Sequence, residues 1–150
     1  MQLFSRFTTQ KIRRLHIVFI KPSKYDDDGY VIRHFRGVLP SNTLACLYGL
    51  TEAVRRRRML GEVQIKSTLL DEAINKIPVA KIAKYNRRND TKVLVCLAGV
   101  QSNQYPRASD LALQFRAAGV TVLLGGFHVS GMLAMFPTIP PVRSTASPYL

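Results

Sequence analysis

The sequence predicts a single α/β domain built on an open, mostly parallel sheet. Two observations carry this prediction. Apolar runs rich in β-branched residues alternate with segments of helical period along the chain, which is typical of parallel sheets with right-handed crossovers. The 150 residues, with 47% hydrophobic and 21% charged side chains, suit one folded domain with one sizeable core.

The first strand and the first helix follow from apolar periodicity. Residues 15–20 form a continuous apolar and aromatic run, typical of a strand that is buried on both faces. A polar segment follows, in which the acidic run 26–28 favours a turn. Ser41 can cap a helix whose apolar residues repeat at three and four. The arginine run 55–58 ends this helix, where cations compensate the helix dipole.

The next segment alternates apolar and polar residues. Residues 63–68 read as a short second strand near the sheet edge, because they are less apolar than the first strand. Thr68 with Asp71 resembles a capping box, which predicts a helix as far as Pro78. A second helical piece is expected over 79–85.

The remaining elements repeat the pattern. Residues 92–98 predict a third strand that is buried on both faces, and 120–124 predict a fourth. Between them, a helix is expected from about Arg107 to Gly119, the glycine that commonly lies just past a helix end.

Candidate binding residues follow the predicted strands. In open parallel sheets, ligands bind at the carboxyl ends of the strands, near the point where strand order reverses. With the order 2-1-3-4, the loops 22–40 and 99–106 face each other there, and 125–131 is a third loop at the same edge. Gly125 and Gly126 would let a ligand approach the backbone closely.

Several common sites are absent from the sequence. The chain has no GxGxxG fingerprint after the first strand and no P-loop motif. A phosphoacceptor receiver would need a carboxylate after the third strand, which ends in an uncharged segment instead. His16 is expected to be packed within its strand, whereas His34 and His128 lie on the ligand-side loops; no second ligand stands at metal spacing, so no metal site is predicted.

Charge and cysteine content indicate which partners and which cellular compartment suit the chain. Lys and Arg number 22 against 9 Asp and Glu, a formal charge of +13 that favours phosphate-bearing partners, anionic membranes or an acidic protein. Residues 117–142 carry no formal charge, but glycines and Pro137 interrupt them, so no membrane span is expected. Cys46 and Cys96 lie in apolar runs and read as buried free thiols of a reducing compartment, which favours a cytoplasmic protein.

A short segment follows each predicted strand; in chain order these are 21–30 (KPSKYDDDGY), 69–72 (LLDE), 99–104 (GVQSNQ) and 125–128 (GGFH). Together these four segments resemble the N-terminal cobalamin-binding domain of cobalamin-type radical SAM proteins. The resemblance covers about residues 15–137. It implies a flavodoxin-like (Rossmann-type) sheet with helices on both faces, which receives the corrin on its carboxyl edge with the nucleotide tail beside the strand ends.

The resemblance also implies the site residues. Ser102 and the pair Gly125 and Gly126 stand where the family contacts the tail, and 24–40 would lie beside the corrin. The full set of expected cobalamin-binding residues is Lys24, Tyr25, Pro40, Gly99, Ser102, Asn103, Gly125, Gly126, Phe127 and His128.

Two departures from the family limit what the chain can do. The DxHxxG motif is absent, which implies base-off binding without a histidine ligand. The CxxxCxxC triad is also absent, and the two cysteines cannot hold an iron–sulfur cluster. The chain is therefore expected not to be catalytic alone, with a separate radical SAM chain as a partner.

The resemblance ends near Pro137, so the chain reads as truncated. We expect a basic segment at 1–14, the α/β domain at 15–137 without its last strand, and an unstructured proline-rich tail at 138–150. A missing strand would leave an exposed edge.

Two alternatives stay open. One is a basic interaction module that binds RNA or an acidic protein through 55–58, Arg87 and Arg88. Because helix-dipole compensation explains the arginine run more simply and no RNP-like signature accompanies it, nucleic acid is not the expected partner. The other is a folded remnant without a ligand.

Overall fold

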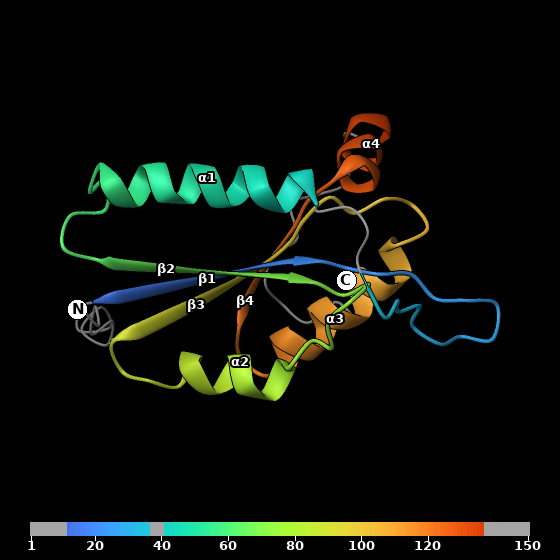
Figure 1. Cartoon of the computed structure of the whole chain (residues 1–150), viewed down its shortest axis with the longest axis horizontal. Helices are drawn as coiled ribbons and strands as arrows, with labels where there is room; N and C mark the ends of the chain where they lie inside the picture. Colours follow the sequence, from blue (N-terminus) through green and yellow to red (C-terminus); the bar gives the residue numbers. More distant parts are fainter. Residues whose placement is uncertain (1–11, 37–40, 137–150) are drawn as a thin grey trace, which may run out of the picture.

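A computed structural model describes residues 12–36 and 41–136 of the chain. It contains a four-stranded parallel sheet in the order β2-β1-β3-β4, with helices on both faces (Figure 1). The predicted fold class and strand order are both confirmed. The elements are β1 (Arg14–Lys21), α1 (Asn42–Arg56), β2 (Gln64–Asp71), α2 (Val79–Asn86), β3 (Thr91–Leu97), α3 (Tyr105–Ala117), β4 (Thr121–Leu124) and α4 (Phe127–Met135).

The helices divide between the two faces of the sheet. Helix α1 packs on β1 and β2, while α2 and α3 pack on β3 and β4 from the opposite face (Figure 1). Strand order therefore reverses between β1 and β3, and the crevice at their carboxyl ends is the expected ligand position for this architecture.

The main core lies between the sheet and the helices α2 and α3. Val18, Val95 and Phe115 are among its fully buried residues. Alternate residues of β3 point into this core, which is why its burial alternates along the strand. The continuous apolar runs of β1 and β3 suit their central positions in the sheet. Residues 18–20 of β1 are buried on both faces, as predicted, but β3 is fully buried on one face only, because Leu94 and Cys96 on the other face are half-buried.

The predicted helix that ends at Pro78 is wrong. Residues 69–71 continue β2, because Leu69 and Leu70 pair with Phe19 and Ile20 of β1. The Asp71 side chain then accepts a hydrogen bond from the backbone N–H of Ala73 at 3.0 Å, which forms a turn in place of a helix cap. Residues 79–86 do form a helix, as predicted.

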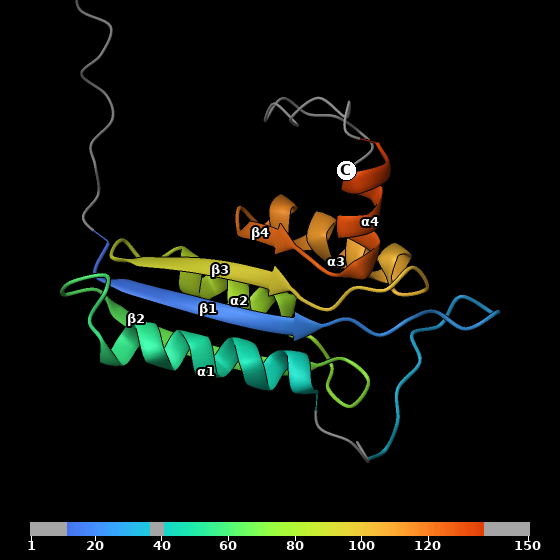
Figure 2. The same ribbon diagram turned by 90° about the horizontal axis from the view of Figure 1, so that it is seen from above.

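Within the described residues, no helix packs on β3 and β4 on the α1 face of the sheet. On this face, Phe19 of β1, Cys96 of β3 and Leu123 of β4 lie in register. Phe19 is buried, Cys96 is half-buried and Leu123 is 55% exposed, so burial falls toward the β4 edge. Figure 2 shows that α1 lies along β2 and β1 and leaves β3 and β4 in view. We call Leu94, Cys96 and Leu123 the open strip.

The cysteine prediction is correct only in part. Both thiols are free, but Cys46 on α1 is exposed and not buried. Cys96 is half-buried, and burial raises the pKa of its thiol. In the described part of the chain, no helix is both long and apolar enough to cross a membrane.

Candidate functional site

The loop after β3 and the start of α4 meet at the carboxyl edge of the sheet. The backbone N–H of Val100 donates to the carbonyl of Gly125 at 3.1 Å, and the N–H of His128 donates to the carbonyl of Val100 at 3.1 Å. Two of the loops singled out in the sequence are therefore joined directly. Parallel strands carry their following loops to one edge, and backbone hydrogen bonds fix the spacing of these two.

The two adjacent glycines have different roles. A Cβ atom on Gly126 would lie 2.2 Å from the backbone nitrogen of Val100, and its φ of 147° is one that L side chains rarely adopt. Gly126 is thus required for the close approach of α4 to the chain itself. A Cβ on Gly125 would meet nothing within 4 Å, so Gly125 leaves open space at the surface.

The polar rim of this edge comes from Ser102 and His128. Nδ1 of His128 lies 3.1 Å from the hydroxyl oxygen of Ser102, and the His128 ring packs against Tyr105 with 4.3 Å between ring centroids. Phe127, one residue earlier, is 81% exposed. This end of the sheet therefore offers an exposed aromatic ring beside a held serine–histidine pair.

The N-terminus of α1 reaches the same edge. The Ser41 hydroxyl caps this helix by accepting a hydrogen bond from the N–H of Leu44 at 3.4 Å, as the sequence predicts. Gly99 has a φ of 69°, and a Cβ there would lie 3.4 Å from the Thr43 side chain. The α1 N-terminus and the loop after β3 are thus in contact.

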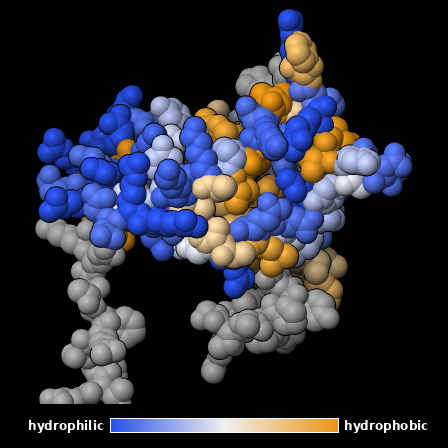
Figure 3. Space-filling view, turned by 90° about the horizontal axis from the view of Figure 1, so that it is seen from below, coloured by the Kyte–Doolittle hydropathy of each residue, from blue (hydrophilic) through white to orange (hydrophobic). Residues whose placement is uncertain are grey.

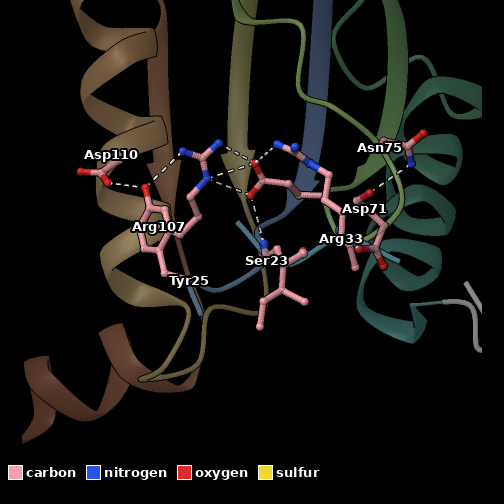
Figure 4. A network of polar contacts seen from close by, with 10 residues as sticks. Ser23, Tyr25, Arg33, Asp71, Asn75, Arg107 and Asp110 are labelled. Carbon is pink, nitrogen blue, oxygen red and sulfur yellow. Dashed lines mark hydrogen bonds and ion pairs between the residues drawn. The ribbon is translucent and has the colours of Figure 1, made fainter. Parts of the chain in front are cut away.

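A second polar cluster lies at this edge, and it was not predicted from the sequence. Glu72, directly after β2, is completely buried. Its carboxylate accepts hydrogen bonds from the Arg107 guanidinium at 2.6 Å and from the N–H of Ser23 at 3.1 Å, and Arg33 lies 4.0 Å away (Figure 4). We call Glu72, Arg107, Ser23, Tyr25 and Asp110 the Glu72 cluster.

Tyr25 belongs to this cluster, so it is not free to face a ligand. Its hydroxyl donates to the Asp110 carboxylate at 2.5 Å and accepts from Arg107 at 3.3 Å (Figure 4). Burial and the hydrogen bond to Asp110 raise the pKa of Tyr25. Burial disfavours the charged form of Arg107, but its hydrogen bonds to Glu72 and Tyr25 outweigh this and raise its pKa.

The Glu72 cluster ties the segment after β1 to α3. The Ser23 hydroxyl also donates to the carbonyl of Ile32 at 2.6 Å, and an isolated bridge pairs Tyr25 with Val31. The segment therefore forms a short hairpin, which the hydrogen bond from the Ser23 N–H to the Glu72 carboxylate attaches to the end of β2. Because the charged groups and the Tyr25 hydroxyl already have partners within the cluster, the cluster acts as a structural link and positions the hairpin.

The remaining candidate residues make no side-chain contact that would position them for a ligand within the described part of the chain. Lys24, Asn103 and His34 are exposed, and Pro40 lies outside the described residues. His16 is buried within β1, as predicted.

The receiver-like acidic run forms only a turn, as the sequence predicts. The Asp26 carboxylate accepts from the backbone N–H groups of Asp28 and Tyr30. Within residues 12–36 and 41–136, no group of three or more His, Cys, Asp or Glu side chains could hold a metal ion.

Comparison with known proteins adds no relative to this picture. No family model, curated protein or solved structure matches the chain.

Proposed function

We propose that the chain is a cobalamin-binding domain that holds the cofactor base-off at the carboxyl edge of its sheet and is not catalytic alone. One observation supports this most: the open strip is an apolar surface that reaches the carboxyl edge beside Gly125, where the backbone is unobstructed. The nucleotide tail of cobalamin ends in an apolar aromatic base, which burial on such a surface would stabilise, while its phosphate and ribose would contact the polar rim.

Different residues of this edge would contact different parts of the cofactor. The nucleotide tail would pass Gly125 and lie on Cys96 and Leu123, while Ser102 would donate a hydrogen bond at the entrance. Phe127 would cover part of the corrin. Bound cobalamin would supply organocobalt chemistry to a separate radical SAM chain, which completes the proposal from the resemblance.

Gly126 needs a different role from the one that the resemblance implies. Its missing Cβ makes room for Val100, not for a ligand. A Gly126 variant would disturb the fold, so it is not a clean test of binding, whereas the open Gly125 is.

The test is co-elution of hydroxocobalamin with the purified chain on gel filtration, read from the visible spectrum of the protein peak. We expect one corrin per chain. Gly125→Val and Leu123→Arg should each reduce retention by about tenfold or more, by blocking the tail or placing a charge on the open strip. The control Arg57→Gln, at the exposed end of α1, should retain the cofactor fully.

Two results would reject the proposal. One is a colourless peak from a chain whose circular dichroism shows that it is folded, which would indicate a remnant without this ligand. The other is loss of corrin in Arg57→Gln with retention in Gly125→Val, which would indicate charge-driven binding.

The alternative basic interaction module has one favourable observation. The arginines that follow α1 and α2 both lie at the amino edge of the sheet, because each helix runs antiparallel to the strands. They flank opposite faces, however, since α1 and α2 pack on opposite sides. Loss of RNA binding in a variant of 55–58, with corrin binding intact, would support this module.

A further inference from the structure

A cavity of about 360 Å³ opens at the amino edge of the sheet, at the opposite end from the open strip. It lies beside α2, which packs on β3 and leaves part of β2 uncovered on the same face. The cavity volume falls in the range of small-molecule sites. Its lining residues are Arg14, Leu15, His16, Gln64, Ile65, Lys66, Tyr85, Arg88 and Thr91.

The charge of this cavity is all of one sign. Arg14, Lys66 and Arg88 line it, and its lining includes no Asp or Glu. Arg14 pairs with Asp90 at 3.5 Å, outside the lining set. Across the described ranges, no carboxylate lies within ion-pair distance of Lys66 or Arg88. Cationic side chains gathered without counter-charges in a hollow attract anions.

The walls of the cavity are held by contacts within the chain. The Arg88 guanidinium lies over the Tyr85 ring at 4.9 Å, and the Tyr85 ring meets the edge of His16 at 5.7 Å. His16 in turn bonds Thr68, with 2.9 Å between Nε2 and the hydroxyl oxygen. The Arg88 guanidinium is therefore positioned over a partly buried aromatic ring, which lowers its ordering cost on binding, whereas the Lys66 side chain is exposed.

His16 records the electrostatics of this cavity. Burial lowers the pKa of His16, and the charge of Lys66, its partner in the strand register, lowers it further. An anion bound beside Lys66 would oppose the second effect. The pKa of His16 is thus a local probe of occupancy.

From these contacts we infer that the amino-edge cavity binds a phosphate group of a small ligand, with Lys66 and Arg88 as its principal cations. Arg88 can form paired hydrogen bonds with a phosphate, and Lys66 adds a compact charge. Gln64 and Thr91 supply further polar groups at the rim. The site is separate from the proposed cobalamin surface, since it lies at the other end of the strands.

The test is titration of the full chain with inorganic pyrophosphate at constant ionic strength. Calorimetry measures the affinity, and NMR of the histidine side chains monitors His16. Saturating pyrophosphate should shift the His16 signals and raise the pKa of His16. Lys66→Gln and Arg88→Gln should each weaken binding about tenfold, the effect of losing one charge-assisted hydrogen bond. Arg57→Gln removes the same charge from outside the cavity and should change affinity less than about twofold.

Further ligands distinguish the sources of the phosphate. A nucleoside diphosphate that binds more tightly than pyrophosphate and shifts His16 would identify a nucleotide as the ligand. A single-stranded RNA that binds without shifting His16, and that Arg57→Gln weakens as much as Lys66→Gln, would overturn the inference in favour of a diffuse basic surface. Absence of any His16 response to millimolar pyrophosphate would also overturn it. Neither result bears on corrin retention, which is measured separately.

Discussion

At the scale of single residues, the Glu72 cluster carries a clear energetic consequence. Glu72 is fully buried and Arg107 is largely so, with side-chain exposures of 0% and 13%. Removing two charges from water is costly, and their attraction offsets this only while both partners are present. Removal of one partner leaves the other buried without a counter-charge, which costs about 3–5 kcal/mol.

We therefore predict that Glu72→Gln lowers the free energy of unfolding by about 3 kcal/mol. Glutamine keeps the shape of the side chain but leaves Arg107 without a counter-charge. Urea denaturation followed by circular dichroism measures the change. The matched control is Glu52→Gln, which removes a carboxylate whose partner Arg55 is half-exposed on the surface of α1 and should change stability by less than about 1 kcal/mol. Equal effects of the two variants would contradict the structural role of the cluster.

At the scale of elements, α4 differs from the other helices because none of its residues is buried. Backbone hydrogen bonds at its start, through Val100 and His128, attach it to the sheet edge. Its attachment therefore depends on Gly126, whose missing Cβ allows the two backbones to approach. An element held at one end by backbone contacts should be sensitive to a single methyl group there.

We predict that Gly126→Ala loosens α4 and the loop at Val100 while the sheet persists. Alanine would place its Cβ against backbone atoms and would take up a disfavoured φ, at a cost of about 1–3 kcal/mol. Hydrogen exchange should show faster exchange at the amide of His128, with the β1 and β3 amides still protected. Gly125→Ala, one residue earlier and in open space, should leave this pattern unchanged. Global unfolding in Gly126→Ala would mean that α4 is integral to the core.

Most strands of the sheet could be predicted from the sequence, but one predicted helix is wrong. Continuous apolar runs identify β1 and β3, which lie in the middle of the sheet, and also the short edge strand β4. The periodicity of 69–77 predicts the wrong element. Its apolar residues repeat with helical spacing, but pairing with β1 extends the strand β2 as far as Asp71. Tertiary pairing overrides local periodicity here.

Contacts between polar side chains are harder to predict from the sequence than strands are. Glu72 and Arg107 stand 35 residues apart, and no local pattern links them. The expected meeting of 99–104 with the glycine pair needed only parallel topology, so it could be anticipated. The exact role of Gly126 could not, because it depends on a backbone contact with Val100 that arises only in three dimensions.

At the scale of the whole molecule, the apolar surface lies away from the amino edge of the sheet. Hydrophilic side chains cover the amino edge, at the left in Figure 3, whereas the carboxyl half carries apolar side chains with hydrophilic ones among and beyond them. The sequence explains the separation: the arginine runs follow helices that end at the amino edge, whereas 117–136, which includes β4 and α4, carries no formal charge. Each proposed ligand uses the end whose chemistry suits it.

The net charge of the chain predicts how the fold responds to salt. A net charge of +13 destabilises the compact state through like-charge repulsion, which mobile ions screen. Raising sodium chloride from about 20 mM to about 300 mM shortens the Debye length from about 20 Å to about 6 Å, so the Tm should rise. Exposed ion pairs such as Arg14 with Asp90 weaken over the same range, but each contributes little.

Calorimetric melting curves measure this response, and pyrophosphate at matched ionic strength separates screening from specific binding. If the amino-edge cavity is a phosphate site, pyrophosphate should raise the Tm beyond the effect of chloride, because a ligand that binds only the folded state stabilises it by mass action. The extra increase should be smaller in Lys66→Gln, whose Kd is about tenfold larger, and unchanged in Arg57→Gln, because the two residues lie inside and outside the cavity lining. A Tm that falls as chloride rises would instead mean that ion pairs dominate the electrostatics of the fold.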